Sequence, residues 1–138
     1  MKANELMIGD WVQIPEPIFL DTKIPVRVVL IREDDYIEIN DGTGAFGYEL
    51  SRDGVEPVPL TQEIVYKNAD NEYPSEYTTS CRIVYLGKYP NSIEITVYSS
   101  GEIEWTINEC EYTILALKYV HELQHALRLA GIEKEIIL

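Results

Sequence analysis

The segment His121-Glu122-Leu123-Gln124-His125 near the C-terminus has the residue types and spacing of a zinc-binding helix. On an α-helix, side chains at i and i+4 project from one face, so His121 and His125 could both reach one Zn²⁺. Glu122 could then take a proton from a metal-bound water. The segment therefore suggests a zinc-dependent hydrolase, with the two histidines as metal ligands and Glu122 as the general base.

A catalytic zinc needs a third protein ligand, and the sequence does not supply one close to the motif. The chain has only these two histidines. Glu133 and Glu135 follow the motif, but the chain would have to fold back to bring either carboxylate to the metal. Any other ligand would have to be a cysteine or an acidic residue from an earlier part of the chain.

The residues around the motif predict a helix over about 112–130 that packs through its other side. At about 100° per residue, the apolar stripe centres on Leu123, and both histidines fall on the opposite side with Lys118 and Arg128. Two cations beside a site disfavour a dication. We therefore prefer a packing helix with its histidines on a solvated face. Three apolar residues also lie toward that face: Ile114, Leu117 and Leu129. A partner that covers this face, or a cleft there, therefore remains an alternative.

Short strands separated by turn residues fill the first half of the chain. They are expected at Trp11–Ile14, Ile24–Ile31, Tyr36–Ile39, Ala45–Leu50 and Val55–Pro59. Several short strands within about 60 residues favour a small bent sheet or barrel. The Gly9-Asp10-Trp11-Val12 opening is similar to SH3-like barrels. The predicted first module is therefore an SH3-like β module over 1–60.

The second half is expected to mix helix and strand, in a module over 61–138. Its predicted elements are a short helix capped by Thr61, a polar loop over 70–80, a β-meander and a long helix over about 112–130 that Gly131 ends. The meander strands are expected at Cys81–Leu86, Ile93–Tyr98 and Glu102–Ile107. The predicted fold class is thus α+β, with the two modules in one compact unit.

Charge and composition narrow the range of partners. The net charge is −13, from 24 acidic and 11 basic residues, and such a surface repels phosphate backbones, so we expect no nucleic-acid partner. It would attract a basic protein instead. No apolar run is long enough for a membrane span, and no signal peptide is evident, so we expect a cytoplasmic protein. Cys81 and Cys110 are expected to be reduced.

Tyrosine is the dominant aromatic residue. The chain has 10 tyrosines but 2 phenylalanines, and many of the tyrosines lie in the middle of the chain. Tyrosine offers a rigid ring with a polar tip and is enriched at protein interfaces. The simpler interpretation is that most of these side chains are half-buried in strands.

Three segments resemble, in order, those of small uncharacterised bacterial and phage-type proteins. They are Gly9–Val12, Pro57–Ile64 and Tyr119–Gln124. That family has no assigned activity, and its C-terminal pattern is Tyr-Val-His-x-Leu-Gln. The resemblance therefore implies that Glu122 and His125 are optional on a packing helix, which weakens the zinc hypothesis.

These observations favour a non-enzymatic accessory or interaction protein of bacterial or mobile-element origin that needs no cofactor. The alternative is the zinc-dependent hydrolase. The first function predicts an exposed apolar or tyrosine-rich patch for a protein partner. The second predicts a pocket over His121 and His125 with a third ligand at the metal.

Overall fold

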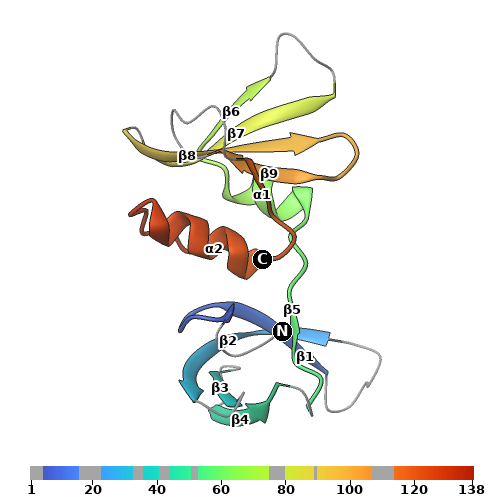
Figure 1. The fold of residues 1–138 in the computed structure, drawn as a ribbon, viewed down its shortest axis with the longest axis vertical. Helices are drawn as coiled ribbons and strands as arrows, with labels where there is room; N and C mark the ends of the chain where they lie inside the picture. The colour runs from blue at the N-terminus through green and yellow to red at the C-terminus, as the bar shows by residue number, and fades with distance from the viewer. Residues whose placement is uncertain are drawn as a thin grey trace. The chain divides into compact units, whose positions relative to one another are not determined.

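The computed structural model describes residues 5–15, 23–32, 36–40, 44–50, 53–74, 80–88, 90–106 and 114–138. The chain forms two compact units, Met1–Val58 and Pro59–Leu138. Each unit contains one five-stranded antiparallel sheet (Figure 1).

The sheet of the first unit has the strand order β4-β3-β2-β1-β5. Its strands are β1 (Trp11–Pro15), β2 (Lys23–Arg32), β3 (Tyr36–Asn40), β4 (Ala45–Glu49) and the very short β5 (Glu56–Pro57). The first four strands form a meander, and β5 returns to pair with β1. The register shifts between Val28 and Leu30, so β2 carries a bulge, a feature that bends a strand and increases its twist.

The core of the first unit follows from residue alternation along these strands. In β1 and β3 every second residue is buried, because successive side chains of a strand point to opposite faces. The buried residues form one apolar cluster of Leu6, Val12, Ile14, Val26, Val28, Ile37, Ile39, Leu50 and Val55. Full burial of such a side chain contributes about 1.5–3 kcal/mol, so this cluster holds the unit together.

The Gly-Asp-Trp-Val opening combines a turn at Gly9 with the start of β1 at Trp11. Gly9 has a φ of 90°, a value that favours glycine, and its N–H donates to the Val28 carbonyl at 2.7 Å. The carboxylate of Asp10 is fully buried and accepts the Met7 N–H at 2.7 Å. This motif therefore locks the entry to the sheet, which accounts for these residue types without any binding role.

The second unit is a β-meander with two helices. Its elements are α1 (Gln62–Asn68), β6 (Asn71–Pro74), β7 (Cys81–Lys88), β8 (Asn91–Tyr98), β9 (Ile103–Thr106), β10 (Ile114–Ala116) and α2 (Val120–Leu129). The strand order is β10-β9-β8-β7-β6. Both helices lie on the same side of this sheet (Figure 1). The strand residues on one face are buried: Val84, Leu86, Ile93, Ile95, Val97, Ile103 and Trp105.

Helix α1 anchors the C-terminal tail of the chain. It begins where the Thr61 hydroxyl accepts the Ile64 N–H, as predicted for this cap. At its other end, the buried amide of Asn68 donates to the Ile137 carbonyl at 2.8 Å and accepts the Ile137 N–H at 2.9 Å. The Asn68 side chain thus pairs with the main chain of the tail as a neighbouring strand would.

Helix α2 ends at the predicted glycine. Gly131 has a φ of 69°, and the Ile132 N–H donates to the Leu127 carbonyl at 2.9 Å. The Gly131 N–H donates to the Arg128 carbonyl, so both hydrogen bonds of a Schellman cap are present. Ile132 is buried directly after the cap, as is common for the residue that follows such a glycine.

The predicted α+β fold class, with a long C-terminal helix over about 112–130, is wrong. The protein is mostly β: 51% of the residues that the structure describes lie in strands, and both helices found among them are short. The segment 114–116 pairs with β9 instead of extending the helix, because apolar spacing in so short a stretch fits either structure. Part of the predicted polar loop over 70–80 is β6, an edge strand, where polar residues and proline are tolerated.

No helix in the described part of the chain has the length and apolar character needed to cross a bilayer.

Candidate functional site

The two histidines of the predicted zinc motif lie on α2, but they are packed differently from the prediction. His121 is only 6% exposed, so the prediction that this residue lies on a solvated face is wrong. Its ring stacks on Tyr119, with centroids 5.7 Å apart and an interplanar angle of 7°. The ring of His125 meets it edge-on at a centroid distance of 5.7 Å. The first histidine is therefore part of an aromatic packing arrangement.

Glu122 caps the helix, which conflicts with a role as general base. Its Oε2 accepts the backbone N–H groups of Lys118, at 2.6 Å, and Tyr119, at 3.0 Å. Glu122 is the third residue of the helix, where a glutamate reaches back to the N-cap residue in a capping box. Its negative charge also stabilises the positive end of the helix dipole. Local helix stability thus explains the residue type at this position.

The residues that the structure describes do not assemble the ligands of a catalytic zinc. His121 is the second residue of α2, inside the N-terminal turn, where the positive end of the helix dipole opposes a dication. Across the described residues, no group of three His, Cys, Asp or Glu side chains is placed to hold a metal. We therefore derive no step through zinc.

Cys81 belongs to no such metal-holding group among the described residues. Cys81 lies in β7 and is partly exposed. Cys110 lies outside the described residues, so its predicted state stays a prediction.

A different constellation lies on the side of the second sheet away from the buried face. We call it the tyrosine–glutamate face and define it by the described outward positions of the four strands β6 to β9. The residues are Asn71, Cys81, Ile83, Tyr85, Gly87, Ser92, Glu94, Thr96, Tyr98, Glu104 and Thr106. Both helices lie on the other side of the sheet (Figure 1).

Two tyrosine–carboxylate hydrogen bonds organise this face. The Tyr85 hydroxyl donates to Glu94 Oε2 at 2.8 Å, and the Tyr98 hydroxyl donates to Glu104 Oε2 at 2.8 Å. The hydrogen bond to Glu104, together with burial and nearby negative charge, raises the pKa of Tyr98 above its ordinary value. A carboxylate that accepts one hydroxyl proton keeps its charge and further acceptor positions. Both tyrosines are therefore held in place beside a negative charge.

The sequence pointed to the tyrosines as a group but not to these two. Strand alternation could have found them, since Tyr85 and Tyr98 stand out of phase with the buried residues of β7 and β8. Their glutamate partners depend on the register between strands, which turn residues alone do not fix. Tyr66 belongs to another contact, under the guanidinium of Arg82 at 5.5 Å.

Comparison with known proteins gives no family for this chain. No protein-family model, no curated protein and no solved structure matches it. The resemblance to bacterial and phage-type proteins therefore stays a prediction from three short segments.

Proposed function

We propose that this chain is a non-enzymatic accessory protein of the cytoplasm that binds a basic protein partner through the tyrosine–glutamate face. The observation that carries the proposal is the pair of hydrogen-bonded tyrosines, Tyr85 and Tyr98, on a sheet face that no described helix covers. It needs no metal or cofactor.

Charge favours a partner that presents lysine and arginine. Glu94 and Glu104 lie on this face, and none of the described residues at its positions is basic. The whole chain carries a net charge of −13, which speeds the approach of a positively charged surface. A basic partner could pair with the carboxylates while its side-chain stems cover the tyrosine rings.

The tyrosines are suited to supply binding energy. Tyr is among the residues enriched at interface hot spots, because a large ring buries apolar area with few rotatable bonds. The hydrogen bonds to Glu94 and Glu104 already fix both hydroxyls, so less side-chain freedom is lost on binding. Thr96 lies opposite Ile83 in the neighbouring strand, which makes it a good position for a disruptive substitution.

The test is a quantitative co-purification of partners with the full chain and two variants. Thr96→Arg places a long cation on the tyrosine–glutamate face. Leu129→Arg adds the same charge on α2, at a residue that is 78% exposed. We expect a basic protein to be recovered with the original chain and with Leu129→Arg, but not with Thr96→Arg. Its recovery should also fall as salt rises, because exposed charges are screened.

The affinity for the identified partner is then measured with Glu94→Gln/Glu104→Gln, which removes two charges and keeps the side-chain shapes. We expect a loss of roughly tenfold, with a smaller salt dependence. Equal recovery with Thr96→Arg, or an affinity that the double variant leaves unchanged, would overturn the proposal. Circular dichroism of each variant separates lost binding from lost folding.

A further inference from the structure

The second unit contains a cavity of about 300 Å³ beside the end of α2. Its lining comes from the start of β8, from β9 and from the last turn of the helix: Pro90, Asn91, Ser92, Ile93, Trp105, Leu129 and Ala130. Cavities of this size lie at the lower end of the range for small-molecule sites. The walls are mostly apolar, with the polar residues grouped on one strand.

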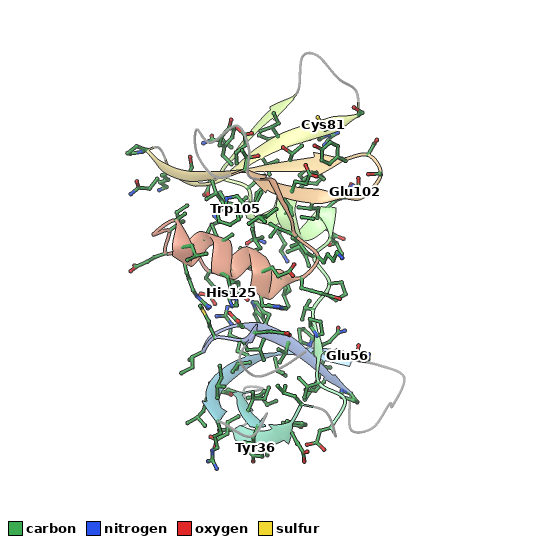
Figure 2. The ribbon with its side chains drawn as sticks, in the orientation of Figure 1. Tyr36, Glu56, Cys81, Glu102, Trp105 and His125 are labelled. Atoms are coloured by element: carbon green, nitrogen blue, oxygen red, sulfur yellow. The ribbon has the colours of Figure 1, made fainter. Side chains whose placement is uncertain are left out.

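Trp105 gives this cavity a chemical preference. The side chain is 7% exposed and lies on the helix side of the sheet (Figure 2). Its indole Nε1 is buried, and no group in the described part of the chain accepts its hydrogen bond. Buried donors in folded proteins are nearly always satisfied, and a donor that lacks an acceptor calls for an explanation. A ligand in the cavity would provide one if it carried an acceptor.

The exposure of Leu129, another residue that lines the cavity, also favours a bound ligand. Leu129 is 78% exposed, the highest value among the large apolar residues exposed in the described part of the chain. An apolar side chain held in water beside a cavity gains burial when the cavity fills. The cavity thus has an apolar wall, and one of its lining residues, Trp105, carries a buried donor for which the described residues supply no acceptor.

We propose that this cavity binds a small free molecule with an apolar body and one hydrogen-bond acceptor, such as a carbonyl, that accepts from Trp105 Nε1. Ile93, Pro90 and Leu129 contact the apolar body. Trp105 and Ile93 belong to the buried face of the sheet, so the site lies on the opposite side from Tyr85 and Tyr98, and the two sites share only Ser92 at the start of β8 among the described residues.

The test uses two probes of nearly the same shape, acetophenone and ethylbenzene, with the full chain. Only acetophenone carries a carbonyl. The chain has two tryptophans, so its ¹H–¹⁵N spectrum contains two indole signals, and Trp11→Phe assigns them. We expect acetophenone to move the Trp105 indole proton downfield in a saturable titration. Ethylbenzene should bind roughly tenfold more weakly, since it makes no hydrogen bond, and should leave that proton without a downfield shift.

Leu129→Ala provides the matched variant, because the side chain is exposed and its truncation leaves no cavity in the core. We expect it to weaken both probes by a similar factor, roughly fivefold, since it removes apolar wall and leaves the donor in place. The proposal is overturned if neither probe perturbs the signals of Ile93 and Ala130. It is also overturned if both probes bind equally and shift the indole proton alike, because the acceptor would then play no part.

Discussion

The two sheets of this protein both present aromatic residues outward, but they pair them with opposite charges. In the first unit the partners are arginines. The guanidinium of Arg27 lies 4.5 Å from the ring centre of Trp11, and that of Arg32 lies 5.2 Å from the ring centre of Tyr36. Each such cation–π contact is worth about 0.5–1 kcal/mol at an exposed site.

In the second unit the partners are glutamates. Tyr85 and Tyr98 donate their hydroxyl protons to Glu94 and Glu104, across neighbouring strands. The hydrogen bond uses the tyrosine hydroxyl and one lone pair of the carboxylate. This hydrogen bond leaves the faces of the tyrosine ring and the negative charge of the glutamate available for other contacts.

The difference lies in what each kind of contact leaves available on the surface of its sheet. An arginine over a ring uses the cation and the ring face within the same sheet, which stabilises the sheet. A tyrosine–glutamate pair orients both groups yet keeps them able to meet a cation from another molecule. This contrast supports the proposal that the second unit carries the binding face, and the predictions below test how differently the two sheets are built.

The largest effect is expected at a glycine of the second sheet. Gly87 has a φ of 96°, and a Cβ there would lie 2.4 Å from the Asn91 carbonyl oxygen. Gly87→Ala should therefore lower the free energy of unfolding by about 3 kcal/mol, measured by urea denaturation. Gly101 is the matched control, because it has a φ of 97° with no atom within 4 Å of a Cβ. Gly101→Ala should cost about 1 kcal/mol. Equal losses would show that backbone conformation alone matters.

A smaller effect is expected where an aspartate ties the second sheet to the C-terminal tail. Asp70 Oδ2 accepts the Gly87 N–H at 2.7 Å and the Lys134 ammonium at 2.8 Å. Burial raises the pKa of Asp70, but the hydrogen bonds from Lys134 and Gly87 outweigh it, and the net pKa is lowered. Asp70→Asn should therefore cost about 1 kcal/mol at neutral pH.

The pH dependence of that loss follows from the direction of the shift. Because the folded pKa lies below the unfolded value of about 3.9, the carboxylate stabilises the fold above that value. The stabilisation disappears as the pH falls through the folded pKa. Urea denaturation between neutral and acidic pH should show the original chain and Asp70→Asn converging at low pH. Lys134→Gln should reproduce part of the loss at neutral pH, and a loss that is independent of pH would contradict the assignment.

A glycine of the first sheet should be far more tolerant than Gly87. A Cβ at Gly47 would overlap the phenol of Tyr36, with the hydroxyl oxygen at 1.4 Å. The obstacle is the far end of a side chain that can turn away, and alanine suits a strand better than glycine. Gly47→Ala should therefore change the free energy of unfolding by less than about 0.5 kcal/mol. A loss as large as that of Gly87→Ala would show that the Tyr36 ring is fixed.

The smallest effect concerns a single proton on the tyrosine–glutamate face. Glu104→Gln removes the charge that holds the Tyr98 proton, so the pKa of Tyr98 should fall toward the ordinary value of about 10. Ultraviolet titration measures the ionisation, and Tyr98→Phe identifies the transition. An unchanged pKa would mean that Glu104 is not the main cause of the shift.

Much of the fold could be predicted because its signals are local. The strands β1 to β4 and β7 to β9 show apolar alternation or β-branched runs, and Thr61 and Gly131 mark helix ends by their side-chain chemistry. The two strands that were missed, β6 and β10, lie at sheet edges. Their pairing depends on the exposed backbone of β7 and β9, which the sequence of the edge segment does not encode.

The role of the His121–His125 segment was harder to predict, because it depends on how α2 packs in the folded protein. The helical wheel around Leu123 assumed a single apolar stripe, but His121 and Gln124 are also buried, so α2 is covered over more of its circumference. The Glu122 cap would have been visible in the sequence had the helix start been placed at 120 instead of 112. A boundary error of about two turns thus turned a capping residue into a supposed general base.

The hydrogen bonds between Asn68 and the tail determine which substitutions are tolerated at positions 68 and 137. The Asn68 amide hydrogen-bonds to the main chain of Ile137, and the Ile137 side chain is 58% exposed. Nearly any residue can therefore replace Ile137. Proline is the exception, because it lacks the N–H that Asn68 accepts. Relatives of this protein are therefore expected to vary at position 137 while they retain asparagine at position 68.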